Sequence, residues 1–315
     1  MAGNFRKTFQ MVQKGAIHWF PGHMGKGLRQ MQQKLKSVDC LIEVHDARIP
    51  LSGRNPEFKY TISGIKPHIL VLNKKDLTEN KHLKEVGNTI KQKEGIDHVL
   101  YTNAKDQKCN GMRRIVPTAV ELIRKSDRFN RTEMKEYCVM IIGVPNVGKS
   151  SVLNALRNKH LRKSNASAVG AVAGITRSVL MKIKICEDPL IYMIDTPGIL
   201  APQIKDNEMG LKLSLCGCLQ DHLVGEDLIA DYLLFWLNKH ERFEYVELMG
   251  LEKPTDNIGE VLVQCAMKIQ KYKKLRNYDG QIVVRPDLLC AAQYMVKAFR
   301  NGYFGKVNLD AEFFS

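Results

Sequence analysis

Runs of apolar residues alternate with amphipathic stretches along the first two thirds of the chain. Short apolar runs bounded by turn-forming residues predict buried strands at about residues 38–45, 68–72, 99–102, 137–142, 179–186 and 190–194. Helical spacing predicts helices between some of these strands, at about residues 111–125 and 150–157. Strands that alternate with helices favour an α/β fold, in which a mostly parallel sheet carries helices on both faces.

The pattern changes after about residue 205, where apolar residues repeat only at helical spacing. These repeats lie at residues 227–240, 258–272 and 288–299. No run approaches the roughly 20 apolar residues that a membrane-spanning helix needs. We therefore predict three parts: a basic N-terminal segment (1–19), an α/β domain (20–205) and a small all-α C-terminal domain (206–315).

The charge of the chain is strongly basic and unevenly distributed. The formal net charge is +15, and residues 1–38 and 137–186 contain seven and eight Lys or Arg residues, respectively, without any acidic residue. Such a field favours a polyanionic partner, most simply RNA, although a basic bias shared by a whole cellular compartment is the alternative. A further basic stretch at 268–276 is expected to be helical, with five positive charges that either lie along RNA phosphates or form a solvated face.

The N-terminal segment combines basic and apolar residues. Within residues 1–17, Arg6 and two lysines stand among apolar residues that include Phe5 and Phe9, and no acidic residue is present. This composition is typical of an amphipathic mitochondrial presequence, and a basic arm that contacts RNA is a second interpretation. The eight cysteines are scattered, and we expect reduced thiols rather than metal ligands or disulfides.

The strongest chemical signal is the sequence GVPNVGKS at residues 143–150. It matches the phosphate-binding pattern G-x-x-x-x-G-K-[ST] and stands between a predicted strand and a predicted helix. The glycines allow backbone N–H groups to turn toward phosphate oxygens, Lys149 supplies a positive charge to the β- and γ-phosphates, and the Ser150 hydroxyl is a ligand for Mg²⁺. The residues predicted to line the phosphates are Asn146, Val147, Gly148, Lys149, Ser150 and Ser151.

Two further motifs point to guanine as the base. The sequence NKKD at 73–76 follows a predicted strand, and Asp76 is suited to accept hydrogen bonds from the N1–H and N2–H₂ groups of guanine, which adenine lacks. Asn73 is expected to tie the base to neighbouring loops, and the stem of Lys74 to cover the ring. The sequence TNAK at 102–105 follows the next strand, where the Ala104 N–H is expected to reach guanine O6. The predicted guanine-binding residues are Asn73, Lys74, Asp76, Asn103, Ala104 and Lys105.

Two segments after the phosphate loop are candidate switches. The sequence DTPG at 195–198 follows an apolar strand, so that Asp195 can hold Mg²⁺ through water and Gly198 can offer its N–H to the γ-phosphate. In the sequence GITR at 174–177, Thr176 can add its hydroxyl to the Mg²⁺ shell, unless this segment is an ordinary surface loop. We therefore predict bound GTP or GDP with Mg²⁺, held by Ser150, Thr176 and Asp195.

The order of the motifs is unusual. In common small GTPases the phosphate loop comes first and the guanine motifs last, whereas here the guanine motifs precede the phosphate loop. The same sheet can form in a circularly permuted domain. Residues 106–136 would then connect the two ends that are the termini of a common GTPase domain, and the new ends of the domain would lie after the second switch. The chain should then enter the helical domain directly after residues 195–198, so that a change in this switch moves that domain.

These motifs in this order resemble the circularly permuted GTPases of the YlqF/RbgA family, which act in ribosome assembly. Further matching pieces are HWFPGHM at 18–24, DARIP at 46–50 and GEDLIADY at 225–232, so the resemblance covers nearly the whole chain. With the presequence-like start, it is strongest to mitochondrial members. The resemblance implies GTP hydrolysis, binding to the large mitochondrial ribosomal subunit late in its maturation, and a location in the matrix, at the inner membrane. We expect a peripheral protein and a monomer.

The resemblance also suggests residues for the hydrolytic step. Many GTPases carry a glutamine after the D-x-x-G motif, but this chain has Ile199, which cannot orient water. The family likeness points instead to His23 as the residue that positions the attacking water, alongside the catalytic Lys149 and Thr176, although His23 can also contact RNA or pack locally. Asn146 resembles the asparagine that holds K⁺ in cation-dependent GTPases, and a simple turn residue is the equal alternative.

Other interpretations of the whole chain stay open. Asp46 and Arg48 either order the nucleotide-facing loops or support the sheet. The main functional alternative is a regulatory GTPase or a GTP-binding scaffold that acts at the mitochondrial inner membrane or in mitochondrial translation. Ile199 supports the scaffold alternative because it cannot orient water for hydrolysis. An RNA-modifying or RNA-cleaving enzyme with GTP as effector is disfavoured because no second catalytic constellation is evident.

Overall fold

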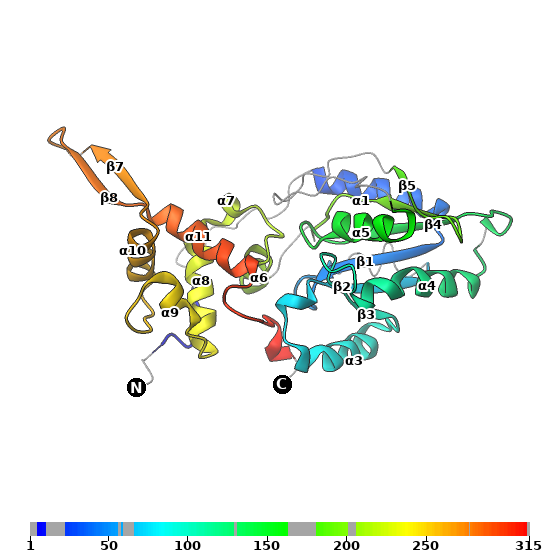
Figure 1. Cartoon of the computed structure of the whole chain (residues 1–315), viewed down its shortest axis with the longest axis horizontal. Helices are drawn as coiled ribbons and strands as arrows, with labels where there is room; N and C mark the ends of the chain where they lie inside the picture. Colours follow the sequence, from blue (N-terminus) through cyan, green and yellow to red (C-terminus); the bar gives the residue numbers. More distant parts are fainter. Residues whose placement is uncertain are drawn as a thin grey trace. The chain divides into compact units, whose positions relative to one another are not determined.

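The computed structural model describes residues 5–10, 23–55, 58, 66–128, 131–162, 181–200, 206–276 and 278–313. The chain divides into two compact units (Figure 1). The helical unit comprises Met1–His18 with Gln220–Gly305, and the sheet unit comprises Trp19–Leu219 with Lys306–Ser315. The predicted boundaries were 19/20 and 205/206. In the structure the second boundary lies between Leu219 and Gln220, and the last ten residues belong to the sheet unit.

The sheet unit is built around a six-stranded sheet with the order β3-β2-β1-β4-β6-β5. The pairs among β3, β2, β1, β4 and β6 are parallel, and only the edge strand β5 runs antiparallel to β6. The strands are β1 (Cys40–Asp46), β2 (His68–Asn73), β3 (Val99–Tyr101), β4 (Tyr137–Ile142), β5 (Lys182–Cys186) and β6 (Ile191–Asp195). The predicted mostly parallel α/β fold is therefore confirmed.

Helices cover both faces of this sheet, with α1 and α5 on one face and α3 and α4 on the other (Figure 1). Every residue of the central strand β1 is buried, as expected for a parallel strand covered on both faces. The helices are α1 (His23–Lys34), α3 (Leu83–Glu94), α4 (Asn110–Arg124), α5 (Lys149–Leu161) and α6 (Asn207–Leu215), with short 3₁₀ turns at Leu35–Ser37, Lys75–Leu77, Asn80–His82 and Ala311–Phe313.

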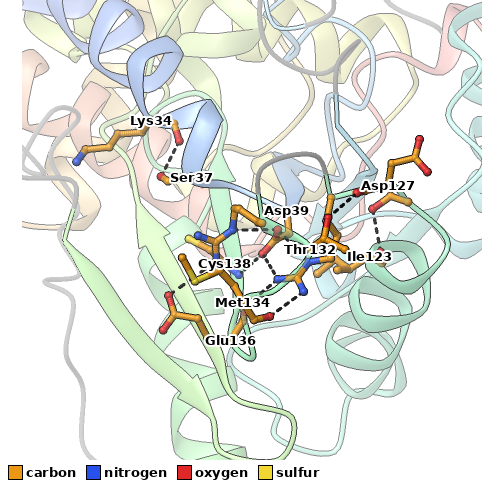
Figure 2. Close-up of polar contacts among 12 residues, drawn as sticks. Lys34, Ser37, Asp39, Ile123, Asp127, Thr132, Met134, Glu136 and Cys138 are labelled. Carbon is orange, nitrogen blue, oxygen red and sulfur yellow. Dashed lines mark hydrogen bonds and ion pairs between the residues drawn. The ribbon is translucent and has the colours of Figure 1, made fainter.

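The segment that connects α4 to β4 lies within residues 106–136, which the sequence predicted to join the ancestral ends, and a buried carboxylate holds it (Figure 2). Asp39, just before β1, accepts a hydrogen bond from the Cys138 N–H (2.8 Å) and pairs with the Arg131 guanidinium (3.1 Å). Arg128 also pairs with Asp39 (3.3 Å) and donates to the carbonyl oxygens of Met134 and Glu136. The described residues of this connection therefore form a joint that Asp39 holds to the start of β1.

The helical unit contains α7 (Asp221–Val224), α8 (Glu226–Lys239), α9 (Glu244–Met249), α10 (Ile258–Lys268) and α11 (Leu288–Asn301), with a hairpin of β7 (Tyr272–Arg276) and β8 (Ile282–Pro286) between α10 and α11. The prediction of a basic helix at 268–276 was wrong, because α10 ends at Lys268 and the following residues pair with an apolar strand that lies beyond the turn. No helix of the described residues is long and apolar enough to cross a membrane.

Candidate functional site

The loops that follow the parallel strands meet at one edge of the sheet. β1, β2 and β6 end at Asp46, Asn73 and Asp195, and β4 leads into the phosphate loop. Because parallel strands present their carboxyl ends at the same edge, the motifs separated along the chain become neighbours there. The hydrogen bonds described below confirm this proximity.

Close packing fixes the phosphate loop. Gly143 and Gly148 have φ values of +146° and +98°, in a region that side chains disfavour. A Cβ atom at Gly148 would lie 2.4 Å from the Asn73 amide nitrogen, and one at Gly198 would lie 2.5 Å from the backbone of Pro145. The phosphate loop, the guanine loop and the DTPG segment therefore pack so tightly that only glycine fits at these points.

Lys149 and Ser150 begin helix α5, where backbone N–H groups point out of the helix. The Lys149 ammonium is buried and donates to the carbonyl oxygens of Gly143 (3.2 Å) and Val144 (2.9 Å). Burial lowers the pKa of Lys149 to about 8, although Asp195 partly offsets this effect. The site thus holds a cation whose charge is incompletely neutralised by the protein and is available to phosphate oxygens.

The Ser150 hydroxyl donates to the Asp195 carboxylate over 3.1 Å. This pair places a neutral and an anionic oxygen side by side at the end of the phosphate loop, and Mg²⁺ prefers such hard oxygen ligands. The donor set therefore fits the predicted metal. The third predicted ligand, Thr176, lies outside the described residues, as does the whole segment 163–180.

Asn73 links the two guanine motifs to the phosphate loop. Its amide nitrogen donates to the Val147 carbonyl oxygen (2.9 Å), and its amide oxygen accepts from the Ala104 N–H and the Thr102 hydroxyl, both at 3.1 Å. Asn73 thus links the loops to one another in the structure, and its predicted tie to the base stays a prediction. Asp76 is exposed, so its carboxylate is accessible to a base.

The remaining predicted base-site residues shape the same loops. Lys74 adopts a left-handed conformation (φ +61°) and its ammonium donates to the Asn146 carbonyl oxygen (2.9 Å). In the second guanine loop the Asn103 side chain accepts from the Lys105 N–H (2.9 Å), which closes a local turn. Ser151 lies in the first turn of α5.

Asp46 and Arg48, whose role the sequence left open, lie fully buried behind the nucleotide loops. The Arg48 guanidinium pairs with both Asp46 oxygens (3.0 and 2.8 Å), and the Lys74 ammonium lies 2.9 Å from the same carboxylate. Burial opposes ionisation of Asp46, but the charges of Arg48 and Lys74 outweigh it and hold the pKa of Asp46 well below its usual value. The geometry favours a role in ordering the nucleotide-facing loops.

Asn146 stands at a positive φ of +57° and donates from its amide nitrogen to the Gly217 carbonyl oxygen (2.8 Å). This geometry accounts for asparagine as a turn residue, since asparagine tolerates the left-handed region better than most side chains. It also ties the phosphate loop to the end of α6, a contact that the sequence did not predict. A role of Asn146 in K⁺ binding stays a prediction.

Ile199, at the position where many GTPases carry glutamine, is buried, and its N–H donates to the Gly143 carbonyl oxygen (3.2 Å). Helix α1 starts at His23, and a Cβ at Gly27, about one turn later, would lie 3.3 Å from Pro197 and 3.4 Å from Ile199. The backbone of His23 therefore stands one turn from a contact with the DTPG segment, while its side chain lies outside what the structure describes.

Residues 138–275 match the family described as 50S ribosome-binding GTPase. The chain is 62% identical to "Mitochondrial GTPase 1" of Aedes aegypti, over 100% of both chains. It is 48% identical to "Mitochondrial ribosome-associated GTPase 1" of Bos taurus, over 98% of this chain and 92% of that one. Among solved structures, GNP-bound YlqF from T. maritima aligns with a TM-score of 0.56 and 23% identity, over 90% of this chain and 97% of that one. The structural likeness concerns the fold.

Proposed function

Because the chain belongs to the family of mitochondrial GTPase 1 proteins, we propose that it is a GTP-driven switch that binds the large mitochondrial ribosomal subunit late in assembly. GTP with Mg²⁺ favours binding, and hydrolysis to GDP releases the protein. The protein works in the matrix, at the inner membrane. The names of the relatives, two of which refer to mitochondria and one to ribosomes, support this proposal together with the net charge of +15.

The observation that best supports GTP hydrolysis is the hydrogen bond of the Ser150 hydroxyl with Asp195 (3.1 Å) beside the buried Lys149 ammonium. In the proposed mechanism Ser150, Thr176 and Asp195 would hold Mg²⁺, which would supply positive charge to the phosphate oxygens. Lys149 and the N–H groups at the start of α5 stabilise the charge that develops on the transferred phosphoryl group.

The proposed base specificity comes from the guanine loops. Asp76 accepts from the N1–H and N2–H₂ groups of guanine, and the Ala104 N–H, which donates to the Asn73 amide oxygen in the structure (3.1 Å), turns to O6 when the base binds. Asn73 still links the loops through its bonds with the Val147 carbonyl oxygen (2.9 Å) and the Thr102 hydroxyl (3.1 Å). A base that lacks these donors would leave the Asp76 carboxylate desolvated without partners, which is the physical reason for discrimination.

His23 is the proposed residue that positions the attacking water. Ile199 offers no polar atom for this task, and α1, which begins at His23, contacts the DTPG segment through Gly27. Docking on the subunit brings the His23 side chain to the attacking water, so that hydrolysis is slow in the free protein and fast on the ribosome.

The β7–β8 hairpin is the proposed element for RNA contact. All residues of β7 are exposed, and the strand carries Lys273, Lys274 and Arg276 beside Tyr272, while Tyr278 in the turn is also fully exposed. A two-stranded hairpin has little stability alone in water, so an exposed one with this charge is suited to a polyanionic partner. Its tyrosines can stack on unpaired bases.

The test is GTP turnover in K⁺ buffer, alone and with purified large mitochondrial subunits. We expect strong stimulation by the subunit, and a loss of about 10²- to 10⁴-fold of the stimulated rate in His23→Ala, the range typical of a positioned catalytic group. His222→Ala, which removes an exposed histidine of α7, is the matched control and should keep the stimulated rate.

One observation favours a second candidate, a GTP-binding scaffold at the inner membrane, because a buried Ile199 stands where a water-orienting glutamine is common. Normal GTP binding without any stimulation by the subunit would support the scaffold. Pelleting with subunits or with liposomes then separates a ribosomal from a membrane partner.

A further inference from the structure

The C-terminal end of the chain returns to the sheet unit after the helical unit has been completed. We call residues 306–313 the C-terminal strap. Its residues Val307, Asn308, Leu309 and Asp310 are all buried, with exposed fractions of 5% or less. Burial of four consecutive residues near a chain end needs specific partners, because terminal segments are otherwise poorly ordered.

The first partner is the loop that carries Asp76. The Val307 N–H donates to the carbonyl oxygen of Leu77, the residue after Asp76, over 3.0 Å. The Leu77 N–H in turn donates to the Lys74 carbonyl oxygen (2.9 Å), which closes the short 3₁₀ turn at Lys75–Leu77. The strap therefore holds the guanine loop at the residue next to its carboxylate.

The second partner is the loop after β1. The Leu309 N–H donates to the Arg48 carbonyl oxygen (2.8 Å). The Asp310 carboxylate accepts from the N–H groups of Leu51 and Ser52, both at 2.8 Å, and from the Ser52 hydroxyl. A buried carboxylate with three donors aimed at it fixes both segments, since loss of this acceptor would leave the donors without a partner away from water.

The contacts of the strap with Leu77 and with the loop after β1 both support the guanine loop, which carries Lys74 and Asp76. The Arg48 side chain pairs with Asp46, and Asp46 holds the Lys74 ammonium at 2.9 Å. Lys74 therefore receives support through Asp46, while the residue after Asp76 is held directly by the strap. The strap is also joined to α6, where the Lys212 ammonium lies 2.7 Å from the Glu312 carboxylate and 3.7 Å from the Asp310 carboxylate.

We propose that Asp310 and the C-terminal strap position the guanine loop, so that the affinity and base selectivity for guanine nucleotides depend on residues outside the nucleotide site. The inference rests on the proposed assignment of Asp76 to guanine. The physical reason is that two hydrogen bonds to a base edge require a loop already in place, and ordering a free loop on binding weakens affinity.

The test measures release of a fluorescent GDP analogue by stopped flow, and the preference for GDP over inosine diphosphate, which lacks the 2-amino group. We expect Asp310→Ala to accelerate GDP release by about tenfold. The variant should also bind GDP over inosine diphosphate with a smaller ratio of affinities, because a misplaced Asp76 carboxylate forms a weaker hydrogen bond with the 2-amino group of guanine. Ser52→Ala removes only one hydrogen bond to Asp310 and should give a smaller change in the same direction, in a chain that keeps the carboxylate.

Glu312→Gln is the control, since it weakens the pairing with α6 and leaves the contacts with the guanine loop intact. Its GDP release and base preference should match the unaltered protein. The change in base preference separates positioning from general destabilisation, which would weaken both nucleotides alike.

Asp76→Asn independently tests the assignment of Asp76 to guanine. This variant should prefer xanthine nucleotides over guanine nucleotides. If Asp76→Asn behaves so while Asp310→Ala and Ser52→Ala leave GDP release and base preference unchanged, the strap proposal is overturned and the guanine assignment stands. If Asp76→Asn leaves guanine specificity intact, the assignment itself fails.

Discussion

Lys149 shows how a single residue combines a sequence motif with an environment that only the fold provides. The motif fixes its place at the start of α5, and burial against the phosphate loop lowers its pKa to about 8. Nearby charge comes from Asp195 and favours the protonated form. A phosphate tail would favour that form further, so nucleotide binding and proton binding are linked at this residue.

We therefore predict that nucleotide affinity falls as the pH rises above about 8, by up to about tenfold per pH unit, because the free protein must then take up a proton when it binds. Titration of GDP affinity from pH 7 to 9.5 measures this slope. The stability of the nucleotide-free protein should change in the opposite sense, since a lysine with a lowered pKa binds fewer protons in the folded state. A flat affinity profile would show that Lys149 stays fully charged.

At the scale of elements, one buried carboxylate fastens the joint between α4 and β4 to the start of β1. Asp39 holds this joint through the Arg131 and Arg128 guanidinium groups and the Cys138 N–H, as Figure 2 shows for the contacts around Asp39. Side chains of Arg128 and Arg131 are only 12% and 8% exposed, so solvent screens these pairs weakly.

Asp39→Ala should lower the free energy of unfolding by roughly 3 kcal/mol, because it leaves buried charge and a strand N–H without their acceptor. Asp39→Asn keeps an acceptor and should cost less. Glu136→Gln, which alters a half-exposed pair with Lys182 (3.1 Å) and a long contact with Arg131 (3.8 Å) but leaves Asp39 in place, should change the free energy by less than about 1 kcal/mol. Denaturant unfolding measures all three, and equal effects of Asp39→Ala and Glu136→Gln would contradict the proposed importance of the joint.

The β7–β8 hairpin shows where element prediction failed. Residues 268–276 continue the helical spacing of α10 far enough to suggest a longer helix, and the alternative strand becomes favourable only through its pairing with Ile282–Pro286. Pairing with a partner outside the local window carries no signal in the segment itself, which is why strand propensity depends on context.

At the scale of the whole molecule, the N-terminal segment is part of the helical unit. Arg6 forms ion pairs with Asp231 (2.7 Å) and Asp256 (3.0 Å), and Phe9 packs on the rings of Tyr232 and Phe235 at 5.3 and 5.6 Å. Residues that have the composition of a presequence thus also complete the folded protein.

We therefore expect the mature protein to retain Arg6, since removal of residues 1–10 would expose an aromatic cluster and leave two carboxylates without this partner. N-terminal mass spectrometry of the protein from mitochondria checks the prediction, and a mature form that starts after residue 10 would refute it. As a physical control, Arg6→Ala should lower the Tm by a few degrees, whereas Lys7→Ala, at an exposed neighbouring residue, should not.

The sequence alone determined the order of the motifs and the chemistry proposed for the nucleotide site. The phosphate loop, the guanine motifs and the DTPG segment are short, and each contains the atoms that its proposed task needs, so their residue types are visible without the fold. The eight cysteines are free thiols among the described residues. The alternation of strands and helices likewise sufficed to predict the parallel sheet, because strands that are buried on both faces consist of continuous runs of apolar residues.

Only the tertiary structure decided how distant residues support that site. Asp310 meets Ser52 across 258 positions of sequence, Arg6 meets Asp231 across 225, and Asp39 meets Arg131 across 92. A single charged residue has no periodicity and no motif, and its effect depends on which donors face it after folding. Chain topology brings these donors to it, and burial then strengthens the interaction, so neither factor can be inferred from the residue's neighbours in sequence.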